Sequence, residues 1–406
     1  MVSFSKNKQY YKFCAYGFLK NLRFFDAFFI LFLVEKGLPY TQIGVLYAVR
    51  EVLINVIEVP SGLLADTYGR KNALMLSFVA YIVSFYLFYS AENFWWFMLA
   101  FILYGVGDAF RSGTHKGMII DYLALKNWQD HKISYYGHTR SWSQKGSALS
   151  SLIAGLIVFH TGSFQNIFLY SIVPYLFNLM LIYSYPKELN KSTHQHEKAP
   201  LVTTIKSFFN IMRQINVLKI INSSAAHSAY LKAVKDYIQL IMIQVAILMP
   251  IMLTVDFDKK NGLVVGALYF FIFLATSQAS RLASWFYDKN KLNISYNSLI
   301  VGFCLGVLCG VFIVLKFWVL GLISMIGIYI IENIRKPILT GVVSDNVPND
   351  ILTSVISAQS LLKTIMTAIL AIVFGILVDN FSIGTAFIVV STTLFLLSIV
   401  INKRVN

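Results

Sequence analysis

Residues 62 to 74 read GLLADTYGRKNAL, and they place three charged side chains between two of the most apolar stretches of the chain. The charges belong to Asp66, Arg70 and Lys71. Because charged side chains are costly in a hydrocarbon layer, the chain is expected to leave such a layer here. Gly62 and Gly69 permit a close approach and a tight reversal of the backbone. We therefore interpret the stretch as a short connection between two membrane-spanning helices.

The composition indicates a membrane protein from end to end. Charged residues make up 13% of the 406 positions, about half of the roughly 25% usual in soluble domains, and the mean hydropathy is +0.65. Apolar runs of about 20 residues recur, long enough to cross a core of roughly 30 Å as helices. The first run lacks a small-residue cleavage site, so we interpret it as a span and not as a signal peptide. The sequence predicts an all-α polytopic membrane protein.

Twelve membrane spans are predicted, grouped as two bundles of six. Their expected ranges are 12–34, 42–64, 73–91, 94–122, 138–160, 164–185, 220–250, 260–282, 293–315, 317–342, 352–378 and 382–402. Most connections are short. The stretch 186–219 is polar and then basic and amphipathic, which is typical of a linker with an interfacial helix. The predicted domains are therefore 1–185 and 220–406, joined by a cytoplasmic linker.

The loop charges predict the orientation. Fifteen lysines and arginines fall on one side of the predicted bilayer, and four fall on the other: Lys36, Lys259, Lys260 and Lys316. Basic loops stay in the cytoplasm, so both termini are expected there, with the chain in the cytoplasmic (inner) membrane. The net charge of +15 is thereby assigned to helix orientation, and no nucleic-acid partner is expected. No metal-spaced Cys/His cluster is present, so no metal or cofactor is expected.

The two predicted halves echo each other at three places in the same order. The matching pairs are FLKNLR at 18–23 with YLKAVK at 230–235, GVLY at 44–47 with GALY at 266–269, and the spacing of Asp108, Arg111 and Asp121 with that of Glu332, Arg335 and Asp345. Three matches in order indicate a parallel internal duplication. Transporters with this arrangement bind their solutes at the interface of the two halves.

The opening stretch resembles a known signature. Gly62, Asp66, Gly69, Arg70 and Lys71 are spaced as in the loop between spans 2 and 3 of the major facilitator superfamily. The twelve spans, the central linker and the duplicated halves extend the resemblance over the whole chain. It implies the fold of that superfamily and a secondary active transporter.

The resemblance also implies roles within the loop, which would act as a gating latch that holds the outward-facing state. Arg70 would pair with Asp121 at the cytoplasmic end of span 4, while Asp66 would cap span 11 near Thr353 and Ser354. A carboxylate near a helix N-terminus is favoured by the helix dipole, and partly buried ion pairs of this kind are strong enough to bias two conformations.

The sequence departs from the resemblance at three places. Thr67 replaces the basic residue that usually follows the aspartate, which implies a weaker loop. The other two departures weaken one branch of the resemblance, the proton-driven drug antiporters. Drug antiporters usually carry an arginine in span 4 shortly before a glycine, whereas Leu103 and Tyr104 occupy the nearest positions here. Their proline-containing motif in span 5 is also missing, because 146–155 reads GSALSSLIAG.

Ionisable residues inside spans are functional candidates by default, and most fall in spans 1, 4, 7 and 10, which line the cavity in the superfamily. The predicted substrate and proton pathway consists of Arg23, Asp26, Asp108, Arg111, His115, Lys232, Asp236, Glu332 and Arg335. On a continuous helix, Asp108, Arg111 and His115 would share one polar stripe. The stripe has two interpretations: a pathway, or a self-neutralising Asp–Arg pair with a stacked histidine.

Basic residues outnumber acidic ones within the predicted spans, which favours an anionic or zwitterionic polar solute. The first hypothesis is thus a secondary active transporter of such a solute by alternating access, coupled to protons and acting as a monomer in the bilayer. The alternatives are a multidrug efflux proton antiporter and a transport-inactive membrane sensor. No nucleotide-binding loop or hydrolase motif is present, so no enzyme is expected.

Overall fold

The computed structural model describes residues 6–128, 131–190, 215–249, 257–282, 291–346 and 349–403. These residues form helices and contain no strand. The helices up to residue 190 are α1 (Lys8–Lys20), η1 (Phe24–Ala27), α2 (Phe29–Glu35), α3 (Tyr40–Tyr68), α4 (Arg70–Ser90), α5 (Phe94–Arg111), α6 (Thr114–Leu125), α7 (Lys132–Thr161), α8 (Asn166–Tyr183) and η3 (Lys187–Asn190). The later helices are α10 (Ile215–Val234), η4 (Lys235–Tyr237), α11 (Ile238–Leu248), α12 (Phe257–Leu282), α13 (Lys291–Val314), α14 (Trp318–Asn346), α15 (Asn349–Asn380) and α16 (Ile383–Lys403).

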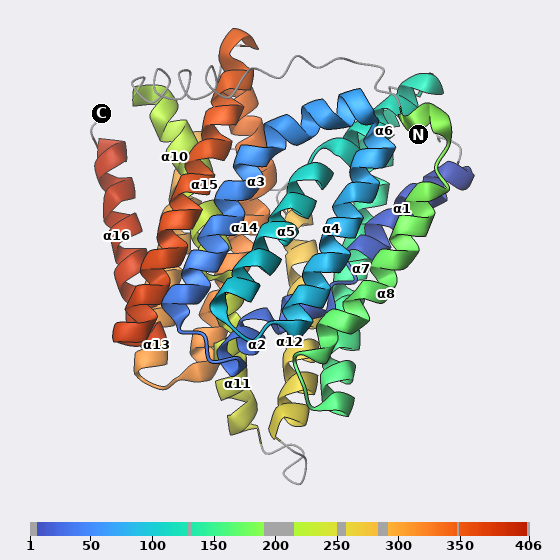
Figure 1. Ribbon diagram of the computed structural model, residues 1–406. Coiled ribbons are helices and arrows are strands. Elements are labelled where there is room, and N and C mark those ends of the chain that lie inside the picture. Colours follow the sequence, from blue (N-terminus) through green and yellow to red (C-terminus); the bar gives the residue numbers. More distant parts are fainter. Residues whose placement is uncertain are drawn as a thin grey trace. The chain divides into compact units, whose positions relative to one another are not determined.

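Seven helices in the described part of the chain are long and apolar enough to cross a membrane. They are found at Arg70–Ser90, Asn166–Tyr183, Lys259–Ala279, Ser295–Val314, Trp318–Lys336, Val355–Asn380 and Ile383–Ile401. The other five predicted spans either carry many polar residues, as α3 and α7 do, or are interrupted (Figure 1). The spans that depart from simple apolar helices are thus the ones that hold most of the candidate site residues.

The spans predicted over 12–34, 94–122 and 220–250 each consist of more than one helix, so the continuous helix assumed for the stripe of Asp108, Arg111 and His115 was wrong. Span 1 breaks between α1 and η1, and span 4 breaks at Ser112–Gly113. In span 7 a short 3-10 helix, η4, separates α10 from α11. Gly113 has φ of 75°, a left-handed conformation that glycine adopts without steric cost. As a result Asp108 and His115 lie on separate helices and do not share a stripe.

Tyrosine hydroxyls donate to backbone carbonyls at two of these breaks. Tyr175 donates to the carbonyl of Lys20 at 3.0 Å, and Tyr329 donates to the carbonyl of Lys235 at 2.8 Å. Irregular backbone at membrane depth requires such partners because no lipid group can replace them. The two carbonyls belong to the echoed stretches 18–23 and 230–235 but lie at different positions in them, and the carbonyl of Lys235 also accepts from the backbone N–H of Ile238.

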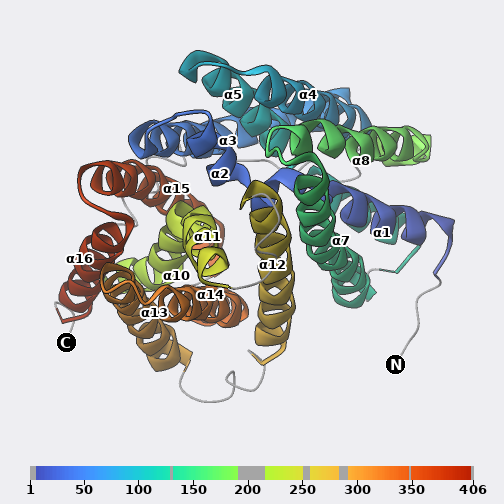
Figure 2. The same ribbon diagram turned by 90° about the horizontal axis from the view of Figure 1, so that it is seen from below.

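Contacts divide the chain into two compact units. Unit 1 comprises Met1–Phe32, Val49–Lys198 and Met252–Phe273, and unit 2 comprises Leu33–Ala48, Ala199–Ile251 and Leu274–Asn406. In unit 1, α1 packs against α7 (Figure 2). In unit 2, α13 packs against both α14 and α16, and α10 packs against α15. The division into two six-span domains remains a prediction.

Glycines allow close helix crossings in each unit. In unit 2, a side chain at Gly44 of α3 would collide with the carbonyl of Ala371 in α15. In unit 1, a side chain at Gly266 of α12 would meet the backbone of Gly155 in α7. Small residues permit such approaches between membrane helices. Gly44 and Gly266 are the first residues of the echoed GVLY and GALY stretches, so each echoed stretch begins with a glycine that allows a close helix crossing.

Aromatic side chains fill the interior of unit 1. Phe25 and Phe168 stack with ring centroids 5.2 Å apart, and Phe29 stacks on Phe101 at the same separation. These rings join η1, α2, α5 and α8. Large apolar side chains such as Trp95 are in contrast exposed on the helix surfaces, as expected where a protein faces lipid. The rigid aromatic core holds the break in span 1 in place, and with it the charged residues at that break.

Candidate functional site

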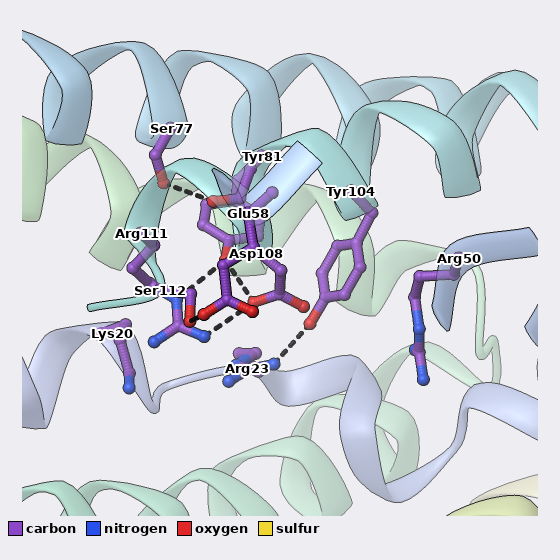
Figure 3. Close-up of polar contacts among 12 residues, drawn as sticks. Lys20, Arg23, Arg50, Glu58, Ser77, Tyr81, Tyr104, Asp108, Arg111 and Ser112 are labelled. Atoms are coloured by element: carbon purple, nitrogen blue, oxygen red, sulfur yellow. Dashed lines mark hydrogen bonds and ion pairs between the residues drawn. The ribbon is translucent and has the colours of Figure 1, made fainter. Parts of the chain in front are cut away.

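Asp108 and Arg111 neutralise each other near the end of α5. Arg111 Nη2 donates to Asp108 Oδ1 at 2.8 Å, and the Tyr81 hydroxyl donates to the same oxygen at 2.5 Å (Figure 3). The Tyr81 oxygen in turn accepts a hydrogen bond from Arg111 Nε at 3.0 Å. His115 stacks on Tyr16 with ring centroids 3.6 Å apart and an interplanar angle of 11°. This geometry matches the interpretation of a self-neutralising pair with a stacked histidine.

A second group of charges surrounds this pair in unit 1. Arg23 donates to the Tyr104 hydroxyl (Figure 3). It also lies 3.9 Å from Asp26, which is half exposed. Lys20 makes no hydrogen bond or ion pair through its ammonium group with any described residue. Both residues belong to the predicted pathway. The structure places Arg23 at the break between α1 and η1 and Asp26 within η1, with their side chains 3.9 Å apart.

A cavity of about 370 Å³ opens between α1, α6 and α7 beside these groups. Four basic residues line it: Lys20, Arg111, Lys116 and Arg140. Among the described residues that line the cavity, none is an aspartate or glutamate. Volumes of this size are typical of small-molecule sites. We call this cavity the basic pocket.

The walls of the basic pocket add hydrogen-bonding groups and flat apolar surfaces. Thr139, Ser143, Gln144 and Ser147 lie on one face of α7, at spacings of one to four residues along the helix. Phe13, Tyr16 and His115 contribute rings from α1 and α6. Such a lining combines charge, hydrogen-bonding capacity and stacking surface, which suits a polar organic anion.

The sequence prediction missed the contribution of α7. Arg140, Ser143 and Ser147 were not among the predicted site residues, although their spacing of three and four positions places them on one helix face. The signal was present in the first half of α7, which is polar well beyond what a lipid-facing span requires. What the sequence does not show is that α7 crosses α1, because no local pattern contains the contact between the two helices.

Unit 2 holds a buried pair that also joins distant parts of the sequence. His227 Nδ1 lies 2.8 Å from Glu332 Oε2, and Ser228 donates to the other carboxylate oxygen. Lys336 lies 3.9 Å from Glu332, close to the limit for an ion pair. His227 was not among the predicted site residues, although it lies in the predicted span 7. The structure makes it the direct partner of Glu332.

The other candidates of unit 2 lie apart from this pair and have their own contacts. Arg335 is buried and donates to the carbonyls of Ser295 and Ser223, each at 2.5 Å. It therefore ties α14 to α13 and α10. Asp236 lies 3.6 Å from Lys235 within η4, so the four-residue helical spacing between Lys232 and Asp236 is interrupted.

The motif at 62–74 is mostly helical. α3 continues through Asp66 to Tyr68, and only Gly69, with φ of 100°, reverses the chain before α4. Gly62 lies inside α3. Arg70 Nη1 contacts Asp121 Oδ2 at 2.5 Å, and Arg70 Nε contacts Asp66 Oδ1 at 3.3 Å. The pairing of Arg70 with Asp121 that the resemblance implied is thus present.

Lys71 attaches the motif to the segment that follows α8. Its ammonium group donates to the carbonyls of Tyr183 and Tyr185, and its backbone N–H donates to Asn190 Oδ1 at 3.0 Å. The predicted contact of Asp66 with Thr353 and Ser354 lies outside the described side chains.

A family profile described as Major Facilitator Superfamily matches residues 15–371. The chain belongs to the major facilitator superfamily. It is 24% identical over 389 residues to an uncharacterized MFS-type transporter, YxaM of Bacillus subtilis (strain 168), covering 92% of this chain and 89% of that one. This protein is therefore a polytopic membrane transporter of that superfamily.

Solved structures of the superfamily share the fold at low sequence identity. The nucleoside transporter NupG has a TM-score of 0.78 at 11% identity, with 98% of this chain and 99% of that chain covered. The peptide transporter POT in complex with sulfate has a TM-score of 0.74 at 13% identity, with 99% and 95% covered. At these identities the similarity concerns the fold alone.

Proposed function

We propose that this protein is a secondary active transporter of a small anionic or zwitterionic polar solute, which it moves by alternating access. The observation that carries the proposal is the basic pocket, with four cationic side chains and no described carboxylate in its lining. A cation in a partly buried site is costly unless an anion compensates it. The solute supplies that anion.

The cations of the pocket differ in burial: Lys20 and Arg111 are partly buried, whereas Lys116 and Arg140 are exposed. Arg111 is compensated by Asp108 at 2.8 Å. Lys20 and Arg140 have no ion-pair partner among the described residues. The two unpaired cations come from α1 and α7, on different walls of the pocket. A solute with one carboxylate, phosphate or sulfonate group between them would contact both.

Proton coupling is the second part of the proposal, and Glu332 with His227 is its best-supported site. A carboxylate and an imidazole 2.8 Å apart in a buried position can share one proton and take up another. Histidine changes charge near physiological pH, which suits a proton carrier. Asp108 is less suited because Arg111 and Tyr81 already hold its ionised form.

The gating latch at residues 62–74 is the third part of the proposal. Arg70, Asp121 and Asp66 connect the end of α3, the start of α4 and α6, all within unit 1. We infer that breaking and remaking these pairs biases the transport cycle between its conformations. A buried pair is strong enough for this because separating its members leaves a charge uncompensated.

The test begins with purified full-length protein and a library of anionic, zwitterionic and cationic metabolites. A specific ligand stabilises the folded protein by mass action, so its unfolding temperature rises, and the compounds that raise it are then assayed for uptake into proteoliposomes. We expect anionic or zwitterionic compounds to stabilise and to be transported. A response confined to cations such as ethidium would favour the multidrug antiporter, and no response in either assay would favour the sensor.

Variants link the result to the pocket. Lys20→Gln and Arg140→Gln remove uncompensated cations, so they are expected to leave the ligand-free protein as stable as before while weakening ligand binding about tenfold or more. Lys126→Gln removes an exposed lysine outside the pocket and is the matched control. Equal effects in all three variants would contradict the assignment of the site.

A further inference from the structure

A second basic cavity lies on a different side of α7. It measures about 410 Å³ and is formed by the start of α1 and the first half of α7. Lys6, His138 and Lys145 contribute nitrogen groups, and Tyr11 and Trp142 contribute rings. None of the described residues that line it is acidic. We call it the interface pocket.

The face of α7 that carries this pocket is the lipid-facing one. Trp142, Lys145, Leu149 and Leu156 follow each other at spacings of three, four and seven residues, which keeps them on one side of a helix. Trp142, Leu149 and Leu156 are 38%, 41% and 49% exposed. Exposed leucines on a membrane helix contact acyl chains, so the pocket opens at the end of an acyl-facing stripe. The basic pocket uses other positions of α7, including Arg140.

The position of the interface pocket across the membrane follows from the length of α7. α7 ends at Thr161, and Trp142 lies about 28 Å before that end at a rise of 1.5 Å per residue. A hydrocarbon core is roughly 30 Å thick. With Thr161 near one edge of the core, Trp142 lies near the other edge. Tyr11 is also exposed at this level on α1, and exposed Trp and Tyr are typical of the headgroup region.

The chemistry of the pocket suits a phosphate group. The Lys145 ammonium lies 4.9 Å from the centre of the Trp142 ring, which holds this flexible side chain over the cavity. Tyr10 Oη and His138 Nδ1 are 3.4 Å apart, so the imidazole is oriented as well. Neither Lys6 nor Lys145 forms an ion pair with a described carboxylate. Cationic nitrogen groups thus surround a cavity whose open side meets acyl chains.

We propose that the interface pocket binds the phosphate-bearing headgroup of an anionic phospholipid. Basic pockets between helices at the membrane surface recognise such headgroups, and each lysine near the surface raises the affinity about fivefold. A free phosphate ion would satisfy the lysines alone. The acyl-facing stripe of Trp142, Leu149 and Leu156 favours the lipid, because an acyl chain can follow it. This inference is independent of the solute that the basic pocket binds.

The experiment uses purified full-length protein in detergent, with short-chain phosphatidylglycerol as the probe and phosphatidylcholine as its neutral counterpart. Native mass spectrometry counts retained lipids, and thermal unfolding measures stabilisation. We expect phosphatidylglycerol to be retained and to stabilise more than phosphatidylcholine. Lys145→Ala should weaken its binding about fivefold, and the Lys6→Ala/Lys145→Ala double variant about 25-fold.

Two controls separate the possible outcomes. Lys187→Ala removes an exposed lysine of η3 outside the pocket and should bind the lipid as the unaltered protein does. Inorganic phosphate is the second control, and stabilisation by phosphate equal to that by phosphatidylglycerol would identify a free-anion site and overturn the proposal. The proposal is also overturned if the two lipids bind alike, or if Lys187→Ala weakens binding as much as Lys145→Ala does. All these variants alter exposed residues, so their unfolding temperatures in phosphatidylcholine report whether they fold.

Discussion

Replacing Asp121 by asparagine should destabilise unit 1 far more than the same change at Asp66. Both carboxylates contact Arg70, but the Asp121 side chain is 4% exposed and lies 2.5 Å from Nη1, whereas Asp66 is 25% exposed and lies 3.3 Å from Nε. Removing one member of a buried pair leaves the other charge uncompensated, which costs about 3–5 kcal/mol. Partial compensation by Asp66 lowers the expected loss for Asp121→Asn to about 2–4 kcal/mol. Asp66→Asn should cost about 1 kcal/mol or less, as more exposed pairs do.

The assay is thermal and denaturant unfolding of the purified variants in one detergent. An Arg70→Gln/Asp121→Asn double variant replaces both charges, so it should be more stable than Asp121→Asn alone, since no buried charge is left without a partner. Gly117→Ala gives an independent probe, because its added carbon would lie 2.5 Å from Arg70 Nη1 and displace the guanidinium. We expect this variant to behave like Asp121→Asn.

Two results would refute this reasoning. If Asp121→Asn and Asp66→Asn lost the same stability, burial would not determine the strength of the pair. If the Arg70→Gln/Asp121→Asn double variant lost as much stability as the Arg70→Gln and Asp121→Asn single variants together, Arg70 and Asp121 would act independently. Uptake measurements on the same variants then test the latch itself, since a latch residue should change the rate of transport even where the protein remains folded.

The remaining predictions concern other elements. Asp379→Ala should destabilise unit 2 by about 1–2 kcal/mol, because it removes the cap of α3. Asp379 accepts hydrogen bonds from the backbone N–H groups of Tyr40 and Thr41 at 2.9 and 2.7 Å. Asp379→Asn keeps one acceptor, so unfolding measurements should show a smaller loss of stability. Gly302→Ala should lower the unfolding temperature because the added carbon would collide with His227, whereas Gly137→Ala, with open space around it, should be neutral or slightly stabilising. His115→Phe should keep the stack on Tyr16 and therefore the stability of the folded protein. His115→Ala removes the stacked ring and should be less stable. If both variants were equally destabilised, the ring nitrogens would matter more than the stack.

The sequence predicted well wherever a short pattern has a short-range cause. Apolar runs predicted an all-helical membrane chain, and the spacing of Gly62, Asp66, Gly69 and Arg70 pointed to the superfamily. The reversal at Gly69 follows from the freedom of glycine at positive φ. The partner of Arg70 was also named correctly, although from family resemblance and not from the local pattern.

Helix periodicity failed where the helices are interrupted. It placed Asp108 and His115 on one stripe, and the break at Gly113 puts them on separate helices. Local propensity does not predict such breaks, because they become stable only when side chains from elsewhere satisfy the released backbone groups. Tyr175 donates to the carbonyl of Lys20, and Tyr329 adds a hydrogen bond to the carbonyl of Lys235.

By itself the sequence determined the class of the protein, the positions of most helices and the excess of positive charge in its interior. The tertiary structure alone decided which charges meet. His227 and Glu332 are 105 positions apart, and Lys20 shares a cavity with Arg140 only because α1 crosses α7. Hydrophobic runs specify that a helix lies in the membrane, because transfer to lipid depends on composition. The pairing of polar faces depends instead on how helices pack, and packing is a property of side chains that are distant in the chain.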